Sequence, residues 1–323
     1  MMKAAVIGVG HLGRFHAEKY SRIETVELVG VADLDRSRAE ETGARLGVPA
    51  FFDHRELLGR VDAVSVAVPT RDHFTVARDF LEAGVHVLVE KPITRTLEEA
   101  EELIALAGRK GLVLQVGHLE RFNPALAAAA AKAGPPLFIE ANRIGPFPDR
   151  NTDVDVVLDL MIHDIDITLS LVGREPRWVH AVGVPVITSR VDIANARLEF
   201  DTGCVANLTA SRISIKSERK LRIFQPDAYL SIDFGQRQVL MARRTAPEAD
   251  GRPGIEAEEL VVGREDALEC EVRAFLTAAA EGTPPQVSGE DGRRALKVAL
   301  KIVEDIRARQ GAWLETQNRR GAW

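Results

Sequence analysis

Three glycines near the N-terminus have the spacing of a phosphate-binding turn. The run Gly8-Val9-Gly10-His11-Leu12-Gly13 fits the pattern G-x-G-x-x-G, and Asp33 follows Gly13 by 20 residues. Gly8 allows a tight turn, and Gly10 lets a pyrophosphate approach the N–H groups that open a helix. Gly13 allows that helix to lie close to a sheet. The run predicts a dinucleotide site that includes His11 and Leu12; the alternative is a glycine-rich turn without a ligand.

Asp33 indicates which dinucleotide binds. A carboxylate at this position accepts hydrogen bonds from the adenosine ribose and repels a 2′-phosphate, which favours NAD over NADP. Arg36 and Arg38 follow closely in the chain and would weaken that preference. We therefore expect NAD as the cofactor, with NADP less favoured.

A lysine follows a second apolar run, in the sequence Val89-Glu90-Lys91-Pro92. Ligands of open α/β sheets lie outside the carboxyl ends of the strands, so we expect Lys91 where a nicotinamide and a substrate meet. Pro92 restricts the backbone of Lys91, and a desolvated lysine beside an oxidised nicotinamide would release its proton more easily. Pro69 ends another apolar run in the same way and is a predicted wall of the nicotinamide site. The alternative is a solvated lysine before a loop.

An acid and a histidine recur at helical spacing further along the chain. Asp159 and His163 are four residues apart, and Asp166 follows His163 by three, so one face of a helix could carry all of them. A carboxylate one turn from an imidazole fixes its tautomer and raises its basicity, which suits proton exchange with a hydroxyl. An exposed ion pair or a divalent metal site would fit the same spacing. We predict no metal, because the sequence offers no further ligand cluster.

The elements that position these residues differ between the two parts of the chain. Apolar runs alternate with helical patterns in the first part, which predicts a doubly wound parallel sheet of right-handed βαβ units. The predicted strands are 3–9, 26–33, 63–68, 85–90 and 112–117, and the predicted helices are 11–21, 36–46, 72–83 and 97–109. We assign residues 1–120 to this α/β dinucleotide-binding domain.

Residues 121–323 are predicted to form a second domain, of the α+β class. Helical patterns at 124–133 and 154–171 precede alternating strands within 178–262, which suggest a large, mostly antiparallel open sheet. We expect a surface loop at 243–254. Two helices at 265–280 and 290–310 should close the chain, the second capped by Ser288.

Composition and charge exclude several classes of function. The 323 residues carry 42 Lys and Arg against 48 Asp and Glu, a net charge of −6, which argues against a nucleic-acid partner. No apolar run reaches the roughly 20 residues that span a bilayer, so we expect no membrane insertion. The N-terminus lacks the features of a secretory signal. Cys204 and Cys270 have no metal-ligand spacing. A cytoplasmic protein is expected.

Together these features resemble the Gfo/Idh/MocA family of nicotinamide-dependent sugar and inositol oxidoreductases. The resemblance rests on the glycine run, Asp33, the Glu90-Lys91-Pro92 turn, the pattern from Asp159 to Asp166, and the run 285–292 before the last helix. It implies an N-terminal Rossmann domain and makes residues 121–323 an α+β substrate-binding and oligomerisation domain. The open sheet of this second domain would form the interface of a homo-oligomer, a dimer or tetramer.

The resemblance also implies roles for individual residues. Lys91 and His163 would handle the proton, Asp159 would orient His163, and the Glu90-Lys91-Pro92 turn would contact the cofactor. Many members carry Asn where this chain has Gly117-His118. His118 either faces the substrate or satisfies a backbone carbonyl.

A narrower likeness lies in the stretches 116–124 and 153–166, which resemble the bacterial branch that oxidises the 3-hydroxyl of UDP-N-acetylglucosamine, a branch associated with lipid A precursor synthesis. A nucleotide diphosphate needs cations. Arg121, Arg143, Arg150 and Arg212 are candidates, and Arg121 is favoured because it follows the last strand of the first domain. With Lys91 and His163, Arg121 and Asn123 are the predicted substrate contacts.

The expected activity is therefore NAD-dependent oxidation of a sugar hydroxyl to a ketone. Another nucleotide sugar, a free sugar or an inositol is the alternative substrate. A non-catalytic, NAD-binding regulator is an alternative of another class, because a dinucleotide-binding fold does not by itself fix a function.

Overall fold

The computed structural model describes residues 1–147, 154–247 and 252–320, with side chains up to residue 310. It divides into two compact units. The first contains Met1–Phe122 and Glu265–Leu296, and the second contains Asn123–Arg264 and Lys297–Trp323. The segment 265–296, which the sequence analysis placed in the second domain, thus packs with the first unit.

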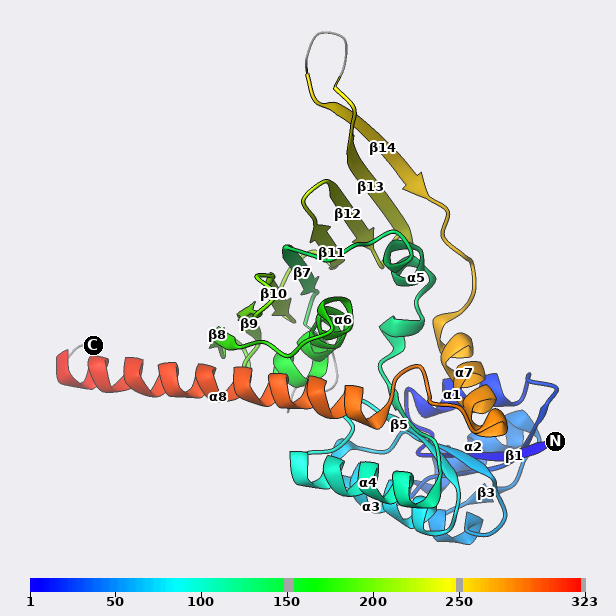
Figure 1. Ribbon diagram of the computed structural model, residues 1–323. Coiled ribbons are helices and arrows are strands. Elements are labelled where there is room, and N and C mark those ends of the chain that lie inside the picture. Colours follow the sequence, from blue (N-terminus) through cyan, green and yellow to red (C-terminus); the bar gives the residue numbers. More distant parts are fainter. Residues whose placement is uncertain (148–153, 248–251, 321–323) are drawn as a thin grey trace. The chain divides into compact units, whose positions relative to one another are not determined.

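The first unit is built on a six-stranded parallel sheet in the order β3-β2-β1-β4-β5-β6. Its strands are β1 (Met2–Ile7), β2 (Val26–Ala32), β3 (Ala50–Phe51), β4 (Ala63–Val66), β5 (His86–Glu90) and β6 (Leu114–Gly117). The helices between them are α1 (Gly13–Tyr20), α2 (Arg36–Leu46), α3 (Thr70–Glu82) and α4 (Leu97–Lys110), of which α3 and α4 lie side by side (Figure 1). Strands β1, β4 and β5 are almost wholly buried, as helices on both faces require.

A later part of the chain completes the core of this unit. Helix α7 (Ala267–Glu281) buries Val272 and Phe275 in the same cluster as Ala4 and Tyr20. Helix α8 (Gly289–Arg320) begins in the first unit, and the Ser288 hydroxyl accepts the Asp291 N–H at 3.2 Å, which confirms the predicted cap.

The second unit is built on an eight-stranded sheet in the order β14-β13-β12-β11-β7-β10-β9-β8. All its neighbours are antiparallel except β7 and β10. The strands are β7 (Phe138–Ile144), β8 (Trp178–Val184), β9 (Ile193–Glu199), β10 (Val205–Ser211), β11 (Glu218–Phe224), β12 (Ala228–Asp233), β13 (Gln238–Thr245) and β14 (Gly254–Leu260).

Helices cover one face of this sheet. Helix α6 (Ile162–Val172) packs on β7 and β10, and α5 (Pro124–Ala130) packs on β12 and β13 (Figure 1). The strands alternate accordingly: Ala206, Leu208 and Ala210 of β10 are fully buried, whereas Val205 and Asn207 are only partly buried. Among the described residues, side chains on the opposite face are partly or largely exposed, as on β8 and β10.

Several local predictions were wrong. Strand β3 was missed because it has only two residues. The predicted loop 243–254 is partly strand, since β13 continues to Thr245 and β14 begins at Gly254. Helix α8 runs beyond its predicted end at residue 310 to Arg320.

None of the described helices is both long and apolar enough to cross a membrane.

Candidate functional site

The glycine turn joins β1 to α1. Gly8 has φ +84°, in the left-handed region, which a Cβ disfavours. A Cβ at Gly13 would collide with the carbonyl oxygen of Gly8, so helix α1 can start here only with glycine. A Cβ at Gly10 would instead meet no atom within 4 Å. Because open space lies above the backbone at Gly10, the turn fits the pyrophosphate of a dinucleotide.

Asp33 is held in place by backbone donors just after β2. One carboxylate oxygen accepts the Val9 N–H and the other accepts the Asp35 N–H, both at 2.9 Å. A carboxylate has about four acceptor positions, so Asp33 keeps capacity for ribose hydroxyls. The Cζ atom of Arg36 lies 4.1 Å from the centre of the Phe52 ring. Arg38 forms an ion pair with Asp35, with 3.1 Å between Nε and Oδ2.

The Lys91 turn is anchored from the side of helix α1. The backbone N–H of Lys91 donates to Glu90 Oε2 at 3.2 Å, and Glu90 Oε1 bonds His16 Nε2 at 3.0 Å. His16 stands three residues after Gly13, so a single carboxylate connects the helix of the glycine turn to the lysine. The Lys91–Pro92 peptide bond is cis, and Lys91 is half-buried.

A second histidine links two loops at the carboxyl end of the sheet. His73 Nδ1 lies 2.9 Å from the Pro92 carbonyl oxygen, and Nε2 lies 2.9 Å from that of Val68. Val68 precedes Pro69, which caps helix α3. One imidazole thus lies between the predicted nicotinamide wall and the lysine turn, within hydrogen-bond distance of a carbonyl oxygen of each, and in its neutral form it donates to one of them at a time.

The charges around the lysine turn are set by burial and by these contacts. Burial acts to raise the pKa of Glu90, but the hydrogen bond and charge of His16 outweigh it and lower the pKa. Burial lowers the pKa of His73, against the opposing effect of the Pro92 and Val68 carbonyls. Glu90 is thus a carboxylate at neutral pH.

The acid–histidine pattern does not begin as a regular α-helix. Residues Val157–Met161 form a π-helical turn, and α6 starts at Ile162. Asp159 and His163 are both half-buried, whereas Asp166 is only 2% exposed. The wider π-turn changes the angular spacing expected for an α-helix. The orientation of His163 by Asp159 stays a prediction.

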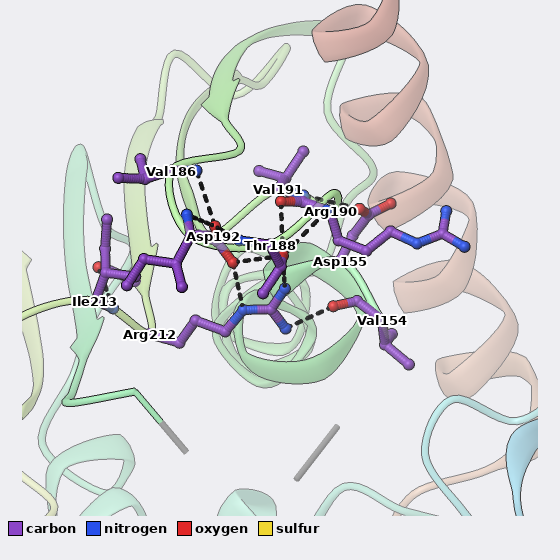
Figure 2. A network of polar contacts seen from close by, with 11 residues as sticks. Val154, Asp155, Val186, Thr188, Arg190, Val191, Asp192, Arg212 and Ile213 are labelled. Carbon is purple, nitrogen blue, oxygen red and sulfur yellow. Dashed lines mark hydrogen bonds and ion pairs between the residues drawn. The ribbon is translucent and has the colours of Figure 1, made fainter. Parts of the chain in front are cut away.

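Two of the candidate arginines are committed to buried ion pairs. Arg212 Nε donates to Asp192 Oδ1 at 2.8 Å and Arg212 Nη1 donates to the Val154 carbonyl at 2.7 Å, while three backbone N–H groups converge on Asp192 Oδ2 (Figure 2). Arg143 makes a two-pronged pair with Asp164, both contacts at 2.9 Å. Both guanidinium groups are at least 94% buried. They hold the second unit together and are not offered to a diphosphate.

The remaining polar candidates lie near residue 120. Arg121 is half-buried in the 3-10 turn Leu119–Phe122, and its carbonyl accepts a bond from Gln286 at 3.2 Å. The side chain of Asn123 accepts the Ala125 N–H at 3.0 Å and caps α5. Arg150 lies outside the described residues. His118 is 1% exposed.

The structure therefore brings part of the predicted site together. The glycine turn, Asp33, the Lys91 turn and Arg121 belong to the first unit, and Asn123, Asp159 and His163 belong to the second. His16 and His73 were not among the predicted site residues. Both lie on apolar helix faces, where a histidine gives no signal of its own.

Comparisons with known proteins identify the family of this chain. The family model "Oxidoreductase family, NAD-binding Rossmann fold" matches residues 2–118, and the model "GFO/IDH/MocA C-terminal domain" matches residues 129–230. UDP-N-acetylglucosamine 3-dehydrogenase of Acidithiobacillus ferrooxidans is 45% identical over 302 residues, 93% of this chain and 96% of that protein. Its solved structure superposes with a TM-score of 0.90 over 95% of this chain and 98% of that one, at 43% identity. Myo-inositol 2-dehydrogenase of Thermotoga maritima is 26% identical over 97% of this chain and 99% of that protein.

Proposed function

Because the chain belongs to the GFO/IDH/MocA family of NAD-binding oxidoreductases, we propose that Lys91 and His163 handle the proton in its oxidation of a sugar alcohol, with Asp159 orienting His163. The enzyme uses NAD to oxidise a CH–OH group. The proposed substrate is UDP-N-acetylglucosamine, oxidised at its 3-hydroxyl, as the relative at 45% identity is named. The ketone would lead to a 3-amino sugar of the kind used in amide-linked lipid A.

One observation carries the proposal for Lys91. Its backbone is bonded to Glu90, and Glu90 is bonded to His16 on the helix that opens at the glycine turn. The cofactor turn and the lysine are therefore parts of one buried scaffold. Such a scaffold suits a group that must meet the reacting end of the cofactor in a fixed geometry.

The chain's own residues then have distinct tasks. When bound, NAD accepts the hydride from the carbinol carbon. Gly10 gives the pyrophosphate access to the N–H groups of α1, and Asp33 accepts the ribose hydroxyls. The hydroxyl proton passes to the base formed by Lys91 Nζ and the imidazole of His163. Arg121 and Asn123 remain the proposed substrate contacts, besides Lys91 and His163.

Replacing Lys91 tests this assignment. Lys91→Met should retain NAD affinity and lower kcat by about 10²- to 10⁴-fold, the contribution of a positioned proton-transfer group. His163→Ala should lower kcat and change its pH profile. Lys301→Met is the matched control, because Lys301 is exposed on α8. Normal turnover by Lys91→Met would refute the assignment.

The substrate needs a separate experiment. The enzyme with NAD should oxidise UDP-N-acetylglucosamine far faster than free N-acetylglucosamine or myo-inositol, and mass spectrometry should show loss of two hydrogens. NADP should support slower turnover, because Asp33 repels its 2′-phosphate. Tight NAD binding without turnover of any sugar in the panel would instead indicate a regulator.

The open face of the second sheet is the proposed interface of a homo-oligomer. On the edge strand β8, Trp178, Val182 and Val184 are 54%, 56% and 46% exposed. Apolar residues gathered on an exposed face are typical of an interface. Light scattering should show a dimer or tetramer, and Val182→Lys should reduce the molar mass that light scattering measures.

A cytoplasmic location is proposed because Cys204 and Cys270 are free thiols.

A further inference from the structure

A cluster of three ionisable groups lies buried behind the lysine turn. His16 comes from α1, Glu90 from β5 and Glu271 from α7, and they are 1%, 9% and 0% exposed. One side-chain donor or acceptor atom of each lies within 4.8 Å of one from each of the others. The backbone carbonyl of Glu271 is fixed by the side chain of Gln115 at 3.1 Å. Two carboxyl groups and one imidazole thus share one buried site.

The two carboxyl groups have different surroundings. Glu90 accepts hydrogen bonds from His16 and from the Lys91 backbone. Neither carboxyl oxygen of Glu271 has a hydrogen-bond partner among the described residues. An ionised carboxylate without donors is far more costly to bury than a neutral carboxylic acid. The site therefore has donors for one negative charge only.

Among the described residues, the groups bonded to this cluster supply no second positive charge for Glu271, and the charge that acts on it is that of Glu90. His16 Nδ1 bonds the Ser65 hydroxyl at 3.1 Å, which bonds the Tyr20 hydroxyl at 2.9 Å. Burial raises the pKa of Tyr20, so its hydroxyl stays neutral. The charges of Lys91 and His73 act on Glu90, where they lower its pKa. Both ring nitrogens of His16 are engaged, Nε2 with Glu90 and Nδ1 with Ser65, so neither is available to Glu271.

We propose that Glu271 is a neutral carboxylic acid in the folded enzyme at neutral pH, and that His16 and Glu271 are positioning residues that keep Glu90 ionised behind the Lys91 turn. Ionisation of Glu271 would place a second negative charge beside Glu90, which could then be relieved only by a proton or by movement of the carboxylate. Either change disturbs the contact that holds the Lys91 backbone. The consequence for turnover rests on the proposed role of Lys91.

The direction of the pKa agrees with this charge pattern. Burial, and then the charge of Glu90, raise the pKa of Glu271 well above its usual value. A carboxyl group whose pKa is higher in the folded than in the unfolded protein makes folding less favourable as the pH rises from the unfolded to the folded pKa. Stability should therefore fall across this interval, up to the folded pKa of Glu271.

Glu271→Gln tests the protonation state because an amide has the shape of the neutral acid and no charge. Urea unfolding should show wild-type stability falling with pH relative to Glu271→Gln, whereas Glu281→Gln, an exposed position on the same helix, should follow the wild type. The infrared spectrum of the wild type at neutral pH should contain a protonated-carboxyl band that Glu271→Gln lacks. In the pH profile of kcat, the decrease at alkaline pH should occur at a higher pH in Glu271→Gln than in the wild type.

Two results would overturn the proposal. If the stability of the wild type and of Glu271→Gln changed equally with pH, and the wild type showed no protonated-carboxyl band, Glu271 would be ionised. A divalent metal bound at one equivalent in the wild type and lost in Glu271→Gln would mean that a metal ion balances the charge. The infrared and unfolding measurements require no substrate, so Lys91→Met should retain both signals even if the proposed catalytic assignment fails.

Discussion

A methyl group added at Gly10 should separate cofactor binding from folding. The position has no positive φ, and a Cβ there meets no atom within 4 Å, so the folded chain can accept alanine. Replacing glycine by alanine at such a position changes stability by about 0 to +1 kcal/mol, because the unfolded chain loses freedom. The methyl group would, however, fill the space through which the pyrophosphate approaches the backbone.

The size of the binding loss follows from the contact that is removed. A hydrogen bond to a charged group contributes about 1.5–3 kcal/mol. Loss of one such bond between the backbone and the pyrophosphate would raise the Kd for NAD about 10- to 150-fold. Calorimetric titration of NAD and urea unfolding of the same samples give the two quantities separately.

Gly13→Ala provides the contrast. Its Cβ would collide with the Gly8 carbonyl oxygen and lie 3.3 Å from Ala67 Cβ, so the backbone must shift. We expect a loss of about 1–3 kcal/mol in stability together with weaker NAD binding. If Gly10→Ala kept the wild-type Kd, or lost as much stability as Gly13→Ala, the assignment of this turn to the pyrophosphate would be refuted.

Three further outcomes concern other parts of the chain. Asp192→Ala should destabilise the protein by about 3–5 kcal/mol in urea unfolding, because it leaves Arg212 buried without its charge partner; a loss below about 1 kcal/mol would contradict this. Gly117→Ala should lower kcat about tenfold or more and cost about 1–3 kcal/mol of stability, because the new Cβ would lie 3.1 Å from Glu90 Cδ and 3.2 Å from Glu90 Cα and would displace the carboxylate behind Lys91; unchanged kinetics would show that Glu90 tolerates movement. Cys204 should resist alkylation in the folded protein at neutral pH, since burial raises the pKa of its thiol to about 11, and mass spectrometry of the labelled protein would check this.

The cofactor-binding part of the fold was predictable because its signals are local. Helix α2 occupies the predicted residues 36–46, and β5 ends at Glu90 as predicted. Each depends on apolar periodicity and turn residues within a short stretch. The return of α7 into the first unit was not predictable, because no local pattern states which core a helix joins.

The arginines show the same division between local and distant information. Arg143 and Arg212 were reasonable candidates for a diphosphate as isolated cations. In the structure Asp164 and Asp192 neutralise them inside the second unit. Charge alone did not distinguish a binding residue from a structural one, because the distinction depends on burial and on partners distant in sequence.

The amino-acid sequence by itself determined the dinucleotide turn, its acid at Asp33 and the lysine at the end of a buried strand, because neighbouring residues create these features. Tertiary structure alone decided that Glu271 lies beside Glu90 and that His16 bonds to Glu90 on the inner side of the lysine turn. The protonation of such groups follows from desolvation and from charges brought together by folding, and neither exists along an extended chain.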